Sequence, residues 1–178
     1  AVFYYTSLDK YSTTLQRQPD SVRVTGVAGE EMKTTGINGT SQFGYSLATG
    51  DFNADGKTDL AVGAYALNSN QGRVYLFYND GSIPTSAYSP DRVITGNAAG
   101  DKFAYALGAG DFNNDGKTDL VASAPGYNSS QGRVYAFWND GNYPASASSA
   151  DLTITGEAGT SQFGSSLAVG ILSNNIRA

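Results

Sequence analysis

The chain has 178 residues, a formal charge of −5, and neither cysteine nor histidine. A chain of this length is expected to form one well-buried domain. Without Cys and His, the chain cannot form disulfides, thiol or imidazole nucleophiles, or the usual zinc sites. The acidic excess would repel phosphates, so nucleic-acid binding is not expected.

The composition and the sequence pattern also indicate the fold class and the absence of a predicted membrane span. Gly (22) and Tyr (12) are abundant, which is typical of short strands joined by tight turns, so an all-β fold is predicted. No apolar stretch approaches the roughly 20 residues that span a bilayer, so no membrane span is predicted. No signal peptide or initiator Met precedes Ala1, as expected of a processed or excised product.

The first predicted elements belong to an incomplete unit of a sixty-residue repeat. Residues 1–5 align with residues 61–65, so residues 1–36 enter the repeat at its second strand. A strand is expected at 32–36, and an extra strand at 22–24 is an open alternative. Residues 8–21 have no clear strand pattern.

The next unit is predicted as four short strands, at residues 44–50, 59–65, 72–78 and 91–95. Alternating side chains in the first strand and an Asn-Asp-Gly turn after the third support this division. The apolar positions are expected to form the core: Phe43, Leu47, Leu60, Val62, Val74, Leu76 and their counterparts sixty residues later.

The unit returns in residues 97–156, so the architecture is repetitive. Four strands per repeat are typical of a β-propeller blade, and a blade buries both faces only by stacking on neighbours. The predicted fold is all-β, with about three four-stranded antiparallel blades of about sixty residues, circularly shifted in the chain.

A nine-residue loop joins the first two strands of each unit. Side-chain oxygens stand at loop positions 1, 3, 5 and 9, with Gly at position 6 for the sharp turn. This pattern wraps a hard cation such as Ca²⁺. The expected ligands are Asp51, Asn53, Asp55, Lys57 (by its carbonyl) and Asp59, and, in the second loop, Asp111, Asn113, Asp115, Lys117 and Asp119. Two structural calcium sites are predicted; metal-free Asx turns and a catalytic carboxylate pair are the alternatives.

A third copy of the loop has lost these ligands. Ile171, Ser173 and Asn175 stand where the first loop has Asp51, Asn53 and Asp55, so two sites are expected and not three. Solvent-open loops of this kind suit the millimolar calcium outside cells. We therefore expect an extracellular or cell-surface location.

The motifs around the loops carry a family resemblance. Phe43-Gly44 and Phe103-Ala104 precede the two loops, and Ala61-Val62-Gly63-Ala64 and Ser123-Ala124-Pro125 follow them. Together they resemble FG-GAP repeats, the units of integrin alpha-subunit propellers and of bacterial integrin-like proteins. The resemblance is weaker in residues 1–36. It implies adhesion or recognition, with calcium loops on one face of the propeller and ligand-contacting loops on the opposite face.

We interpret residues 1–178 as a single propeller segment. One blade is expected at 37–96, another at 97–156, and a third at 1–36, completed by 163–178. Three blades do not close a ring, and their bare faces would expose large apolar patches. Association is therefore expected, with a second copy of the chain, with the rest of a longer propeller, or with another protein partner.

Loops between the second and third strands are candidate ligand contacts. They place Tyr65 near Asn68 in one unit and Tyr127 beside Asn128 in the next. An aromatic ring beside amides can bind a sugar, although ordinary polar loops are the simpler interpretation. The leading hypothesis is a calcium-stabilised extracellular binding, adhesion or assembly module and not an enzyme. A lectin-like propeller and an accessory domain of a secreted enzyme are the alternatives.

Overall fold

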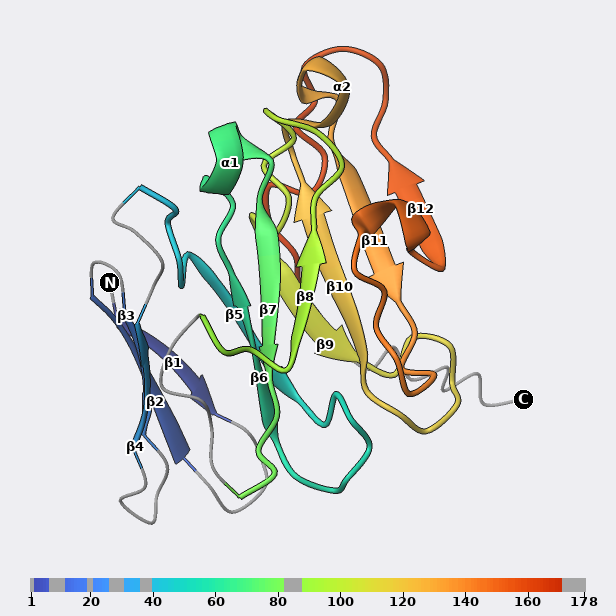
Figure 1. Cartoon of the computed structure of the whole chain (residues 1–178). Helices are drawn as coiled ribbons and strands as arrows, with labels where there is room; N and C mark the ends of the chain where they lie inside the picture. Colours follow the sequence, from blue (N-terminus) through green and yellow to red (C-terminus); the bar gives the residue numbers. More distant parts are fainter. Residues whose placement is uncertain are drawn as a thin grey trace.

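The computed structural model describes residues 2–6, 12–18, 21–25, 31–35, 40–81 and 88–170 of the chain. Almost all regular structure in these ranges is β-strand (Figure 1). None of the described helices is long and apolar enough to cross a membrane.

The described strands form three four-stranded antiparallel sheets, each with its strands in chain order. The first sheet contains β1 (Val2–Thr6), β2 (Ser12–Gln18), β3 (Ser21–Thr25) and β4 (Glu31–Thr35). The second contains β5 (Ser46–Gly50), β6 (Asp59–Gly63), β7 (Arg73–Phe77) and β8 (Arg92–Thr95). The third contains β9 (Leu107–Gly110), β10 (Asp119–Ala124), β11 (Arg133–Phe137) and β12 (Leu152–Thr155). Short turns α1 (Leu67–Asn70), α2 (Tyr127–Ser130) and η1 (Ala147–Ser149) complete the described elements.

The first sheet differs from the arrangement expected from the repeat. By alignment, β1, β2 and β4 hold the places of the second, third and fourth strands, and β3 is the extra strand considered at 22–24. The sheet thus reaches four strands without residues 163–178. Of these, the described residues 163–170 instead adjoin the third sheet, where Phe163 bridges to Gly132 and Val169 lies beside Gly108. The predicted completion of the first blade is therefore not met within one chain; residues 171–178 lie outside the described residues.

The second and third sheets match the predicted strands closely, and their registers are equivalent. Leu60 faces Phe77 across β6 and β7, and Leu120 faces Phe137 across β10 and β11. The repeat in sequence is thus a repeat in hydrogen bonding, because a shift of one residue would turn each apolar side chain to the wrong face.

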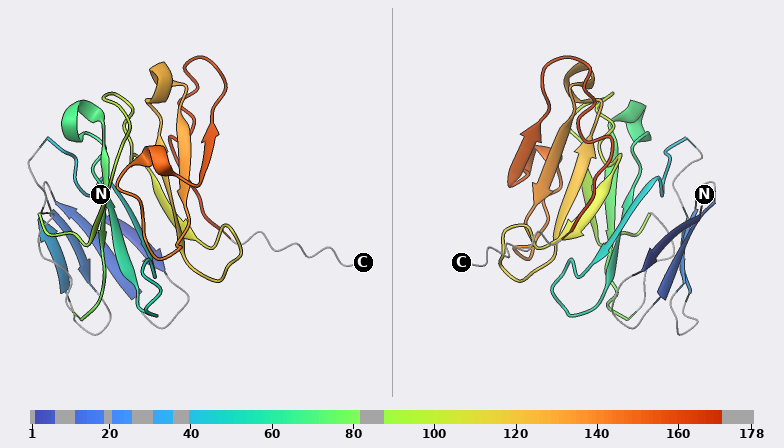
Figure 2. Two further views of the ribbon diagram at one scale, coloured as in Figure 1. Left: turned by 45° about the vertical axis from the view of Figure 1, so that its right-hand side comes forward. Right: turned by 180° about the vertical axis from the view of Figure 1, so that it is seen from behind.

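The second sheet is buried on both faces. One face packs against the third sheet through Val74, Leu76 and Ile94. The other face gathers Phe43, Leu60, Val62, Tyr75 and Phe77, on the side where Figures 1 and 2 show β1–β4. The predicted core is confirmed at most positions, although Leu47 and Val134 are only partly buried.

Neighbouring blades are joined by backbone bridges at two glycines, which the sequence pattern predicts only as turn residues. Gly72 and Phe103 form a parallel bridge, and Gly132 and Phe163 form the equivalent bridge one repeat later. Gly72 has a φ of +82°, and a Cβ there would meet the Phe103 carbonyl oxygen. Only glycine permits both the left-handed backbone and this close approach.

The short turns before these glycines are left-handed. In α1, Asn68 and Ser69 have φ values of 51° and 57°, and α2 repeats them. The turn directs backbone carbonyls to the next blade, since Ser69 accepts from Gly100 N at 3.0 Å and Asn70 accepts from Lys102 N at 2.7 Å. The unfavourable backbone is thus offset by hydrogen bonds between blades.

Candidate metal loops and ligand loops

The two Asp-rich loops lie at the same end of adjacent sheets. Residues 51–58 join β5 to β6, and residues 111–118 join β9 to β10 (Figure 1). The turns α1 and α2 lie at the opposite end of the sheets. This placement agrees with the one that the family resemblance implies for calcium loops and ligand loops.

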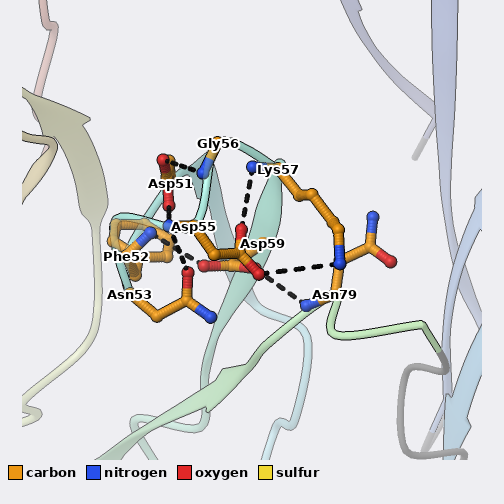
Figure 3. Close-up of polar contacts among 8 residues, drawn as sticks. All are labelled: Asp51, Phe52, Asn53, Asp55, Gly56, Lys57, Asp59 and Asn79. Carbon is orange, nitrogen blue, oxygen red and sulfur yellow. Dashed lines mark hydrogen bonds and ion pairs between the residues drawn. The ribbon is translucent and has the colours of Figure 1, made fainter.

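The exposed part of the first loop is shaped by its own side-chain oxygens (Figure 3). The Asp51 carboxylate accepts from the backbone N–H groups of Asp55 at 3.0 Å and Gly56 at 2.8 Å. The Asn53 side chain also accepts from Asp55 N at 3.1 Å, and Asp55 accepts from Lys57 N at 2.8 Å. The alternating oxygens thus face the inside of one tight loop.

Asp59 has a different position from the other loop acids because it is buried at the start of β6. One carboxylate oxygen accepts from Phe52 N at 2.8 Å and the other from Asn79 N at 2.8 Å. Asp59 therefore ties the loop to the chain that follows β7. Sequence reasoning identified neither Phe52 nor Asn79, although the Asn-Asp-Gly turn that begins at Asn79 repeats with the loop.

Burial raises the pKa of Asp59, an effect that the hydrogen bonds from Asn79 and Phe52 oppose and the nearby Asp55 and Asp51 charges reinforce. Since the folded-state pKa lies above the unfolded value, this group contributes stability at low pH that is lost as the pH rises through the folded pKa. The ionised carboxylate is therefore a local cost to folding that a nearby positive charge would offset.

The second loop repeats this geometry almost atom for atom. Asp111 accepts from Asp115 N at 3.1 Å and from Gly116 N at 2.9 Å. Asp119 is fully buried and accepts from Phe112 N at 2.9 Å and Asn139 N at 2.9 Å. The exposed Asp115 has a lowered pKa, mainly because it accepts from the Lys117 backbone N–H. The two loops are therefore equivalent in structure.

The donor chemistry of the loops fits a hard cation, because every candidate ligand atom is an oxygen. No group of three or more acidic, His or Cys side chains in the described part of the chain is arranged to hold a metal ion. A bound ion would therefore also need the Asn53 amide oxygen, the Lys57 carbonyl and water. Asp59 can still contribute, since each carboxylate oxygen accepts more than one interaction.

One loop position distinguishes the two repeats and gives a direct prediction. Ala54 has a φ of +60°, and Asn114, at the equivalent position, has a φ of +61°. Asn tolerates the left-handed region better than Ala. Ala54→Asn should therefore raise the free energy of unfolding in urea by about 0.5–1 kcal/mol, and Asn114→Ala should lower it similarly. Equal stabilities for all three chains would contradict this assignment.

The candidate ligand loops are engaged within the molecule. The Asn68 and Asn128 amides donate to Gln71 and Gln131, at 3.4 Å and 2.7 Å. The Arg133 guanidinium lies 3.8 Å from the centre of the Tyr127 ring and covers one of its faces. The structure thus brings Tyr127 and Asn128 into one loop but gives no specific feature that favours a sugar.

Tyr65 belongs to an aromatic cluster that was not anticipated. Its ring meets those of Tyr45 and Tyr105 at centroid distances of 4.6 Å and 5.1 Å. The Tyr45 and Tyr105 hydroxyls are 2.8 Å apart. The sixty-residue spacing of Tyr45 and Tyr105 was the available signal. Beside them lies a cavity of about 290 Å³, where β5, β9 and residues 165–167 converge.

The second and third sheets are four-stranded and antiparallel, pack face to face, and each carry an Asp-rich loop between their first two strands. These features define the class of the protein, which is built of β-propeller blades. The FG-GAP repeat family matches residues 43–77 and 103–137. The chain thus carries two FG-GAP repeats, each running from the Phe before the first strand of a sheet to the end of its third strand. The resemblance noted in the sequence is confirmed.

Relatives of two kinds match the chain. It is 36% identical over 143 residues to phosphatidylinositol-glycan-specific phospholipase D of Rattus norvegicus, a match that covers 74% of this chain and 17% of the relative. It is 32% identical over 136 residues to integrin alpha-5 of Xenopus laevis, covering 72% and 12%. It is 29% identical over 143 residues to integrin alpha-PS3 of Drosophila melanogaster, covering 77% and 12%. The chain therefore spans less than a fifth of the length of these curated relatives.

Proposed function

We propose that the chain is a binding and assembly module of integrin-like propeller type, whose open third sheet packs against a further blade. Equivalent side chains in the second and third sheets carry this proposal. Ile94 of β8 is 0% exposed because the third sheet covers it, whereas Ile154 of β12 is 51% exposed. Phe52 is 1% exposed and its counterpart Phe112 is 41% exposed. The third sheet thus presents the face that the second sheet buries.

The exposed face continues an interface that the structure already contains. Leu152, Phe163 and Val169 add to the exposed apolar side chains around Ile154 and Phe112. Several large apolar side chains exposed on the residues of one sheet and its following segment are what an interaction surface would present. A further blade would cover it as the third sheet covers the second, and for the isolated chain that blade is supplied by a second copy.

Light scattering tests this association. The native chain should have a mass above 18.6 kDa, and Leu152→Asp/Ile154→Asp should return it to 18.6 kDa, because two charges would have to be buried in the interface. Thr153→Asp is the matched control, since Thr153 lies between them on β12 and points to the other face. A native chain that stays at 18.6 kDa at all concentrations would refute association between copies.

We further propose that each Asp-rich loop holds one Ca²⁺. The ligands would be Asp51, Asn53, Asp55, Asp59 and the Lys57 carbonyl, with the equivalent set in the second loop: Asp111, Asn113, Asp115, Asp119 and the Lys117 carbonyl. The repeated geometry and the oxygen-only donors of the two loops support this. The ion would supply positive charge where several carboxylates share a small volume, and so stabilise both turns.

The module is proposed to act outside the cell and without catalysis. Loops that expose most of their ligands to solvent suit millimolar calcium. The phospholipase relatives match over only 17% of their length, and the chain has no His or Cys. We therefore do not transfer the activity in that relative's name to these blades, and assign them to recognition of a protein partner, in line with the integrin relatives.

A further inference from the structure

The two Asp-rich loops lie close to each other across the boundary between the second and third sheets. A Cβ placed on Gly50, next to the first loop, would lie 2.5 Å from Cγ2 of Thr118 in the second loop. Two buried side chains, Asn139 and Tyr143, also connect the loops. Both follow β11, so the third blade supplies both connections.

Asn139 bonds to both loops at once. Its backbone N–H donates to Asp119 in the second loop at 2.9 Å, and its side-chain amide donates to the Asp51 carbonyl in the first loop at 3.1 Å. Its amide oxygen has no hydrogen-bond partner among the described residues. The Asn139 side chain therefore depends on the Asp51 carbonyl for its polar contact.

Tyr143 forms a second, independent connection. Its hydroxyl donates to the Thr118 carbonyl at 3.1 Å, and its ring packs edge to face on Phe52 with centroids 6.2 Å apart. Phe52 in turn donates its N–H to Asp59. Asn139 therefore bonds directly to an acid of the second loop, and Tyr143 packs on the residue that bonds to an acid of the first loop.

We propose that calcium binding at the two loops is positively cooperative, and that Asn139 and Tyr143 carry the coupling. This inference rests on the proposed calcium function of the loops. An ion that orders the first loop fixes the Asp51 carbonyl, and through it Asn139 and its bond to Asp119. The same ion fixes Phe52, and through it Tyr143 and its bond to Thr118. The second loop then loses less conformational freedom when it binds its own ion. Coupling between two binding sites in a protein typically changes the affinity of the second site at least about fivefold.

Calorimetric titration of the whole chain with Ca²⁺ tests the coupling. The native chain should bind two ions, the second about fivefold or more tightly than an independent site. Asp55→Asn, which disables the first loop, should weaken the remaining site by a similar factor. With Asn139→Ala present, Asp55→Asn should weaken that site by a smaller factor, because only the Tyr143 connection remains. Asn79→Ala is the matched control, because Asn79 holds Asp59 as Asn139 holds Asp119 but belongs to the preceding blade.

The outcomes separate the two proposals. Absence of calcium uptake by the native chain would overturn the calcium function and the coupling together. Two independent sites in the native chain would overturn the coupling and leave the calcium function standing. If Asn139→Ala fails to fold, Tyr143→Phe keeps the ring and removes only the bond to Thr118. Coupling that is unchanged in every folded variant would overturn the role of these residues.

Discussion

Asp59→Ala, measured in chelator, should lower the free energy of unfolding by about 3–5 kcal/mol. The carboxylate is buried and accepts hydrogen bonds from the backbone N–H groups of Phe52 and Asn79. Phe52 lies in the loop before β6, and Asn79 follows β7. Removal of the carboxylate leaves two inward-facing donors without a partner, and each costs about 1–3 kcal/mol. Urea denaturation gives the change directly.

The neighbouring acids provide the control for this prediction. Asp55→Ala removes an acid from the exposed part of the same loop and should have a much smaller effect in chelator. Asp59→Asn keeps one acceptor oxygen and should fall between the two. An Asp59→Ala chain that is no less stable than Asp55→Ala would show that Asp59 does not hold the loop closed.

Gly72→Ala should be nearly as damaging, at about 3–5 kcal/mol, because two effects combine. The backbone φ of +82° is unfavourable for alanine, and the new methyl group would overlap the Phe103 carbonyl, which belongs to the bridge between the second and third sheets. The blade boundary must open, or the left-handed turn before it must shift. Thermal or urea unfolding will register either change.

Gly56→Ala separates these two effects. Gly56 has nearly the same φ, +83°, but a Cβ there would meet nothing within 4 Å. It should therefore cost only the backbone term, about 1 kcal/mol. Equal losses for Gly72→Ala and Gly56→Ala would show that the close approach to Phe103 contributes nothing.

The sequence predicted the elements that depend on local pattern. The strands of the second and third sheets, and the loop from Asp51 to Asp59, follow from alternation and from the sixty-residue repeat. Residues 12–18 were missed as a strand because Ser-Thr-Thr-Leu-Gln-Arg-Gln has too few apolar residues to show alternation. Pairing with β1 and β3 defines this strand, and such pairing is a tertiary effect.

Contacts between blades could not be predicted from the pattern of one blade. Asn139 bonds to Asp51 across 88 residues, and Tyr65 meets Tyr105 across forty. The exposure of Ile154 was equally hidden, since its sequence neighbourhood matches that of the buried Ile94. What differs is the presence of a neighbouring sheet, and local sequence does not encode it.

The most direct test of the account is the melting temperature of the chain in Ca²⁺ and in chelator. Calcium at about a hundred times its dissociation constant should add about 2.7 kcal/mol per site and raise the melting temperature by about 5–10 °C for each site, or about 10–20 °C for both. Asp51→Asn/Asp111→Asn, which changes the first ligand of both loops, should abolish most of this rise. The same melting temperature for the native chain in calcium and in chelator would contradict calcium-stabilised blades.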